Sequence, residues 1–115
     1  MNNKQLAEEF VSDNIPRKMG RGVLNGSHMF IDGRAIYSYG YHFPIAVKLE
    51  GDIFIFNKDK YSNSTARQKN NVKTAIGNNQ TILVGTNKLK EIIEMRYTSI
   101  KELMLNKIGD KDENL

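Results

Sequence analysis

The amino-acid sequence predicts an α+β fold, in which an antiparallel four- to five-stranded meander sheet is packed by a middle helix and a long C-terminal helix. Two observations predict the sheet: apolar residues alternate along residues 41–49, and residues 53–56 are apolar on both faces. A third predicts the long helix, because apolar side chains recur at three- and four-residue spacing along residues 88–108. At 115 residues, residues 1–115 are expected to form a single domain.

The N-terminal part of the chain, residues 1–16, is predicted to contain a short helix. Leu6 and Phe10 lie one turn apart and give this helix one apolar face. The helix must end before Pro16, because a residue that precedes proline is disfavoured in the helical conformation. Residues 17–27, which are rich in glycine and basic side chains, are predicted to form a loop.

Residues 28–57 are predicted to form the meander. Its first two strands flank Asp32-Gly33, a dipeptide suited to a type I′ turn, in which both central residues have positive φ. In the next strand five apolar side chains are expected on one face: Tyr41, Phe43, Ile45, Val47 and Leu49. Pro44 predicts that this strand begins late or lies at an edge. Residues 53–56 are predicted to form a central strand.

Residues 64–76 are predicted to form the middle helix, with Ser62 or Ser64 as its N-cap. Gly77 is expected to end this helix in the left-handed conformation. Residues 80–85, rich in β-branched side chains, are predicted to form a further strand.

The predicted C-terminal helix, residues 88–108, carries more apolar side chains than one face needs, and residues 109–115 are expected to be a frayed acidic tail. Several apolar residues lie off its main stripe: Ile92, Met95, and Leu103 or Leu105. This surplus is compatible with a homodimer formed through the helix, or with docking on another protein. The alternative is a helix that packs broadly across the sheet.

The charge of the chain is concentrated in its middle. The whole chain carries a net charge of +4, but residues 17–90 hold twelve basic and four acidic side chains, while both ends are net acidic. A region of one sign attracts polyanions and speeds their encounter with the protein. We therefore expect nucleic acid, and RNA in the first place, as the partner. The alternative is that the excess lysine serves solubility alone.

Composition excludes several classes of protein and site. The chain has no cysteine, so disulfide frameworks, thiolate zinc sites and cysteine nucleophiles are ruled out. Acidic residues are scarce in the middle of the chain and no ligand spacing recurs, so we expect no metal site. No cofactor is expected either. The polar N-terminus fits neither a signal peptide nor a transit peptide, and no apolar run is long enough to span a membrane. A soluble, cytoplasmic protein is expected.

The first candidate site follows the meander and enters the middle helix. It consists of basic and hydroxyl side chains: Lys58, Lys60, Ser62, Ser64, Thr65, Arg67, Lys69 and Lys73. A helix N-terminus offers unpaired N–H groups that favour a phosphate, and hydroxyl groups add further donors. Lys69 and Lys73 lie one turn apart, and Arg67 can add a bidentate contact. The alternative is ordinary N-capping followed by a solvated helix surface.

A second candidate group lies in the meander and combines Arg34 with aromatic side chains: Tyr37, Tyr39, Tyr41 and His42. If Tyr37 and Tyr39 share an exposed face, they can stack on unpaired bases. The competing interpretation is that they fill the core. In the basic loop, three further side chains are expected to contact the nucleic-acid backbone: Arg17, Lys18 and Arg21.

The sequence leaves an enzymatic function open but does not favour it. His28 and His42, together with a lysine, could cleave RNA by general acid–base transfer without a metal. Nothing in the sequence fixes the distance between them, and a lone histidine on a strand is more often structural. No catalytic residue is therefore assigned.

Four stretches of the chain carry recognisable motifs: 36–46 (IYSYGYHFPIA), Phe56-Asn57, Tyr61-Ser62 and 64–68 (STARQ). These motifs resemble those of a family of small uncharacterised proteins encoded by phages, plasmids and archaeal mobile elements. Members look like YSYG.HFPIA, followed by two short strands and a YS..T stretch with a basic residue and often His-Gln. The resemblance covers roughly residues 28–76. This chain departs from the family at Gln68 and Lys69, where a His-Gln pair is frequent.

The resemblance implies a mobile-element setting and the cytoplasm of a host cell, but no activity. Small basic phage proteins are frequently inhibitors of host defence, including anti-CRISPR proteins. We therefore expect a nucleic-acid-binding protein that interferes with a nucleic-acid-guided host defence. One alternative is an inhibitor that docks the same basic surface on an acidic or nucleic-acid-binding groove of a defence effector protein. Another is the small metal-independent nuclease.

Overall fold

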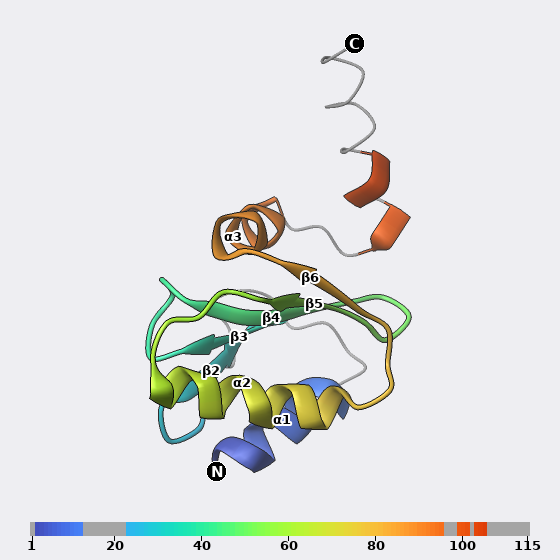
Figure 1. Ribbon diagram of the computed structural model, residues 1–115. Coiled ribbons are helices and arrows are strands. Elements are labelled where there is room, and N and C mark those ends of the chain that lie inside the picture. Colours follow the sequence, from blue (N-terminus) through green and yellow to red (C-terminus); the bar gives the residue numbers. More distant parts are fainter. Residues whose placement is uncertain (1, 13–22, 96–98, 102, 106–115) are drawn as a thin grey trace.

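In the computed structural model the chain forms a mixed β-sheet with helices on both faces (Figure 1). The structure describes residues 2–12, 23–95, 99–101 and 103–105. In chain order the elements are α1 (Asn3–Ser12), β1 (Leu24–Asn25), β2 (Met29–Asp32), β3 (Ala35–Ser38), β4 (Pro44–Leu49), β5 (Ile53–Asn57), α2 (Asn63–Ile76), β6 (Thr81–Val84) and α3 (Thr86–Glu94). The predicted α+β class is confirmed.

The sheet has six strands, which lie side by side in the order β1-β2-β3-β4-β5-β6. Strands β1 to β5 are antiparallel to their neighbours, whereas β6 runs parallel to β5. The prediction of an all-antiparallel sheet of four to five strands is therefore wrong at both edges: one edge has an additional strand, and the strand at the other edge is parallel. Strand β1 falls within the predicted loop 17–27. Strand β6 is parallel because α2, about 21 Å long, carries the chain back along the length of the strands before β6 begins.

Helices cover both faces of the sheet and create two apolar cores. Under one face α1 and α2 pack on a cluster that includes Leu6, Phe10, Ile36, Phe54 and Val72. On the other face α3 packs on a second cluster, which consists of Ala35, Tyr37, Val47, Leu49, Ile55, Leu89, Ile92 and Leu103. The predicted apolar faces of the N-terminal and middle helices are confirmed, because Leu6, Phe10 and Val72 are buried.

A β-bulge in β4 overturns the prediction that its apolar side chains share one face. Ile36 pairs with Ala46, but Tyr37 pairs with Pro44, so Ile45 is an extra residue. The side chains before and after this bulge therefore point to opposite faces. Phe43 and Ile45 pack against α1 and α2, Val47 and Leu49 pack against α3, and Tyr41 is exposed.

The hairpin between β2 and β3 also differs from the predicted type I′ turn. Asp32 pairs with Ala35, so the central residues are Gly33 and Arg34. Only Gly33 has a positive φ, of 64°, which is the pattern of a type II′ turn. Strand β4 begins at Pro44, as predicted.

The predicted helix over residues 88–108 is shorter in the structure. Helix α3 ends at Glu94 with Met95 as its C-cap, Ser99 lies in a bend, and Ile100 is again helical. A straight helix over the predicted range would be about 31 Å long, which exceeds the roughly 20 Å of a six-residue strand such as β4. Of the predicted surplus apolar side chains Ile92 and Leu103 are buried, whereas Met95 and Leu105 are exposed. The predicted tail, residues 109–115, lies outside the described residues.

The described part of the chain contains no helix that is both long enough and apolar enough to cross a membrane.

Candidate nucleic-acid interface

A chain of hydrogen bonds, buried at its centre, fastens the first turns of α2 to the end of the sheet at which β3 ends. Ser62 donates to Thr65 Oγ1 (3.0 Å), which lies 3.0 Å from Ser38 Oγ, and Ser38 donates to Gln68 Oε1. Gln68 Nε2 then donates to the backbone oxygen of His28 (3.2 Å). Ser38, Thr65 and Gln68 are buried, so this network fixes the position of the surface segments around it.

The hydroxyl groups at the start of α2 are mostly used by this network. Ser62 is the N-cap, and its Oγ accepts the backbone N–H of Thr65 (3.1 Å). Thr65 has no exposed surface and cannot contact a nucleic acid directly. Ser62 and Ser64 are exposed and stay candidates for phosphate contacts.

Three exposed tyrosines gather around the loop between β3 and β4. Tyr39 and Tyr41 belong to the loop and are 49% and 56% exposed, and Tyr61, which precedes α2, is 57% exposed. The ring of Tyr61 stacks on Phe43 at 5.1 Å and meets the edge of His42 at 5.5 Å. Its hydroxyl lies 3.2 Å from His42 Nε2. Tyr61 and His42 are therefore held in place and still open to solvent.

Tyr39 is held in a backbone conformation that side-chain-bearing residues rarely adopt. Its φ is 63°, in the left-handed region. The Tyr39 N–H donates to the backbone oxygen of His28 (2.8 Å), and the two rings stack at 5.1 Å. Such strain persists only where the surroundings enforce it, and it is frequent at binding sites.

Tyr41 lies on the α3 side of the same loop. Its hydroxyl donates to Asp32 Oδ2 (2.7 Å), and this hydrogen bond raises the pKa of Tyr41. Its ring meets Phe30 and Tyr37 edge-on, at 4.9 and 5.0 Å. The ring therefore borders the second core and exposes its remaining surface.

Tyr37 occupies the core, as the competing interpretation of the sequence held. It is 3% exposed, stacks on Phe30 at 5.0 Å, and its burial raises the pKa of its hydroxyl. A base cannot stack on a ring that is covered in this way. The predicted pair of Tyr37 and Tyr39 on one exposed face is therefore corrected, and Tyr39 alone is exposed.

The predicted cations around α2 do not all point the same way: the charges of Lys60 and Lys73 act on Lys69, whereas Arg67 points away from it. Lys58, Lys60 and Arg67 are exposed. Lys69 is half-buried beside β5: its Nζ donates to the backbone oxygen of Asp59 (2.7 Å), lies 5.5 Å from the Phe56 ring centroid, and has a pKa lowered by burial. Because successive helical residues turn by about 100°, Arg67 points about 160° away from Lys69.

Lys73 is exposed one turn beyond Lys69, on the same flank of α2. The predicted row of Lys69 and Lys73 therefore runs along the β6 side of the helix, and Arg67 does not belong to it.

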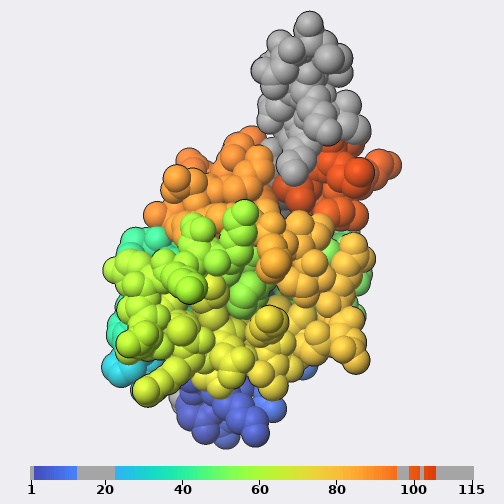
Figure 2. All heavy atoms as spheres, in the orientation of Figure 1, coloured from blue at the N-terminus to red at the C-terminus, as the bar shows by residue number. Residues whose placement is uncertain are grey.

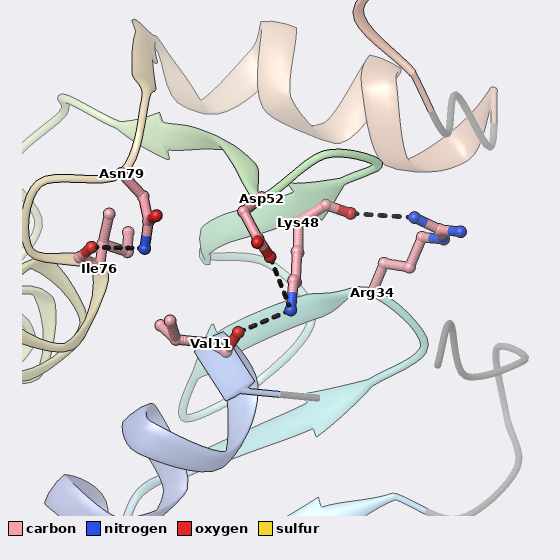
Figure 3. A network of polar contacts seen from close by, with 6 residues as sticks. All are labelled: Val11, Arg34, Lys48, Asp52, Ile76 and Asn79. Atoms are coloured by element: carbon pink, nitrogen blue, oxygen red, sulfur yellow. Dashed lines mark hydrogen bonds and ion pairs between the residues drawn. The ribbon is translucent and has the colours of Figure 1, made fainter. Parts of the chain in front are cut away.

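Arg34 lies far from the other predicted residues. It belongs to the turn before β3, whereas Tyr39 follows β3 at the opposite end of that strand. Its Nη1 donates to the backbone oxygen of Lys48 (3.4 Å), and Lys48 Nζ donates to the backbone oxygen of Val11 (2.6 Å), as Figure 3 shows. Lys48 also pairs with Asp52 at 3.5 Å. This end of the sheet is held together by its own polar contacts.

Three predicted cations cannot be placed, because Arg17, Lys18 and Arg21 lie outside the described residues. Conversely, the sequence reasoning did not select His28, Tyr61 or Gln68 as members of the interface. Tyr61 could have been found from its position between the lysines and the helix cap. The contacts of His28 and Gln68 depend on chain segments that only the fold brings together.

Within the described part of the chain, no group of three or more His, Cys, Asp or Glu side chains could hold a metal ion. No protein-family model, curated protein or solved structure matches the chain.

Proposed function

We propose that the protein binds single-stranded nucleic acid, and RNA in preference, at the end of the sheet formed by the β3–β4 loop and the segment before α2. The observation that carries the proposal is that three exposed rings, Tyr39, His42 and Tyr61, lie around the β3–β4 loop beside exposed lysines. Exposed aromatic rings beside cations form the usual platform for unpaired bases and their backbone. In this proposal Tyr39, Tyr61 and His42 contact bases, and Lys58, Lys60 and Arg67 contact phosphates.

The polar network supports this assignment, because it makes the platform rigid before a ligand arrives. Ser38 and Gln68 fasten α2 to β3 and to the residue before β2, and Tyr61 packs on the loop that follows β3. A preorganised surface loses little conformational entropy on binding. A flexible loop with the same residues would bind more weakly.

The proposed biological setting is interference with a nucleic-acid-guided host defence by a protein of a phage or related element. It rests on the sequence resemblance, whose motifs include the loop residues 38–43 and the cap residues Tyr61 and Ser62. Their convergence on one site is consistent with a shared function. The docking of this surface on a defence effector is the alternative, and it predicts no intrinsic affinity for nucleic acid.

Fluorescence anisotropy with labelled oligonucleotides tests the proposal. We expect single-stranded RNA to bind more tightly than a duplex of the same sequence, and binding to weaken steeply between about 50 and about 200 mM salt as phosphate contacts exchange for counterions. Replacement Tyr61→Ala is expected to weaken binding by about fivefold to a hundredfold, since stacking contributes about 1–3 kcal/mol per base. Tyr61→Phe keeps the ring and should bind nearly as well as the unmodified protein.

The charge contribution has its own matched pair of variants. Lys60→Glu is expected to weaken binding and to reduce its salt dependence. Lys90→Glu makes the same charge change on α3, across the sheet from α2, and should have a much smaller effect. Equal effects of the two lysine variants, or an unchanged affinity for Tyr61→Ala, would remove this site from the proposal.

A further inference from the structure

Strand β6 is the last strand at one edge of the sheet, and the described residues add no further strand beside it. It pairs with β5, where the Phe54 N–H donates to Gln80 O (2.9 Å) and the Lys58 N–H donates to Val84 O (2.8 Å). Alternate residues of a strand direct their backbone groups to opposite sides. Thr81 and Leu83 therefore direct their N–H and C=O groups away from the sheet, where β6 is the last strand.

Strand β6 is short, with four residues, but the described residues show no other feature that usually blocks strand addition. Residues 81–84 include no proline and no charged side chain, and the strand has no bulge against β5. Ile82 and Val84 pack toward α3, but Leu83 points to the other face and is 62% exposed. Figure 2 shows the β6 segment on the visible face of the molecule, between α3 and α2.

A row of positive charge runs parallel to this edge. Lys69 contacts Asp59 and Phe56 and so lies beside the end of β5, and Lys73 follows it by one turn on the same flank of α2. No carboxylate of the described residues forms an ion pair with Lys69 or Lys73. The four residues from Lys69 to Lys73 advance the helix by about 6 Å, close to the roughly 6.6 Å between alternate residues of a strand. The two lysines therefore match alternate side chains of a neighbouring strand.

We propose that the β6 edge binds an extended segment of a partner protein as an added strand, with acidic side chains at alternate positions facing Lys69 and Lys73. The backbone groups of Thr81 and Leu83 would supply the hydrogen bonds, and the lysine row would select the acidic sequence. This activity does not depend on nucleic-acid binding, because its backbone contacts are made by β6. The proposed nucleic-acid site, called the tyrosine platform below, is formed instead by the rings of Tyr39, Tyr61 and His42.

A second copy of this chain fits the edge less well. Antiparallel pairing of two β6 strands about a two-fold axis perpendicular to the sheet would place both α2 helices on the same face. The Lys69–Lys73 flanks of the two helices would then face each other, and like charges in an interface oppose association. An acidic strand would instead be attracted by Lys69 and Lys73, because its charges are opposite to theirs.

Two-dimensional NMR of the ¹⁵N-labelled protein tests the proposal with a synthetic peptide of alternating valine and glutamate. We expect the largest shifts at the amides of Thr81 and Leu83, and slowed hydrogen exchange at both. A peptide of the same sequence, N-methylated at alternate residues on its pairing edge, should not bind, because it keeps its side chains and loses the backbone donors.

Replacing a lysine of the row by glutamate tests whether the row selects acidic peptides. Lys73→Glu should weaken binding of the glutamate peptide by about tenfold and favour a peptide of alternating valine and lysine. Lys4→Glu, an exposed position on α1, should leave both affinities unchanged, and so should Tyr61→Ala, which separates this site from the nucleic-acid platform.

Three results would each overturn the proposal: no binding of the glutamate peptide, equal binding of the N-methylated peptide, or shifts centred on residues 58–61. If sedimentation shows a concentration-dependent dimer, and the Leu83 amide loses its protection from hydrogen exchange when the protein is diluted, the edge binds a second copy of the chain instead.

Discussion

Asp59 lies between Lys58 and Lys60, but its carboxylate is directed at α3. Its Oδ2 accepts the N–H of Thr86 (2.7 Å), the first residue of α3, whose N-cap Gly85 makes no side-chain capping bond. The hydrogen bonds with Thr86, and then the charges of Lys58 and Lys69, lower the pKa of Asp59. Asp59 thus stabilises a helix on the far face of the sheet, while Lys60 stays exposed to a ligand.

This arrangement predicts a defined pH dependence of stability. A carboxyl group whose pKa is lower in the folded state contributes stability above its unfolded pKa, and the contribution is lost as the pH falls through the folded value. Since the ordinary pKa of Asp59 is 3.8, we expect Asp59→Asn to lower the melting temperature at pH 7. The difference from the unmodified protein should shrink below about pH 4.

Thermal unfolding followed by circular dichroism between neutral and acidic pH measures this difference. Asp52→Asn is the control, because Asp52 is exposed in a turn and makes its ion pair with Lys48 at the other end of the sheet. A melting-temperature difference for Asp59→Asn that stays constant down to pH 2.5 would contradict the role of its charge.

Helix α2 ends at Gly77, whose conformation differs from the left-handed one predicted. Its φ is 60° as expected, but its ψ is −125°, and its N–H donates to the Lys73 oxygen (3.1 Å). Asparagine commonly replaces glycine in the left-handed helical region, but this combination of angles is open to glycine almost alone.

We therefore expect Gly77→Ala to lower the free energy of unfolding by about 1–3 kcal/mol. A Cβ atom at this position meets no close neighbour, since the nearest atom, Thr74 O, is 3.8 Å away, so the cost comes from the backbone alone. Gly77→Asn should not recover the loss, whereas Asn78→Ala, at the next exposed residue, should be nearly silent. Urea unfolding measures all three, and full recovery by asparagine would show a left-handed cap instead.

The elements themselves could be predicted because each has a local signal. Ser62 and Gly77 bound α2, Pro44 marks the start of β4, and Leu6 and Phe10 give α1 its apolar face. Their relations could not be predicted in the same way. The bulge at Ile45 has no signature in an apolar run, yet it decides which face each later side chain of β4 meets.

In the candidate site too, the features with a local signal could be predicted, and the relations between segments could not. The lysines and the tyrosine-rich loop stand out in composition, and the structure brings Tyr61 and His42 together as neighbours. Tyr37 and Tyr39 look equivalent in the sequence, but one belongs to a strand under α3 and the other to a turn with positive φ. The end of α3 at Glu94 also lacks a local signal, because neither glycine nor proline follows it and the apolar spacing continues.

Helices on both faces of the sheet restrict where the whole molecule can bind a ligand (Figure 1). A sheet with an open face can offer a row of rings to successive bases. Here, within the described residues, α1 and α2 pack on one face and α3 packs on the other, so a ligand meets the sheet at its ends and edges. The tyrosine platform uses one end, and the proposed strand addition uses the β6 edge.

The second face is covered not only by α3 but also by the helical residues beyond it. Leu103 is 7% exposed and packs in the same cluster as Tyr37 and Leu89, whereas Leu105, two residues on, is 58% exposed. The two leucines thus form a matched pair with the same chemistry and opposite burial.

We expect Leu103→Ala to lower the free energy of unfolding by about 2–3 kcal/mol, from lost apolar burial and the cavity left behind. Leu105→Ala should change it by less than about 0.5 kcal/mol, as substitutions of exposed side chains usually do. Urea unfolding at equilibrium measures both, and tyrosine fluorescence quenching by iodide should increase for Leu103→Ala alone as the cover over Tyr37 loosens. Equal, small effects would mean that α3 suffices to close this face and that the segment containing Leu103 contributes nothing to the core.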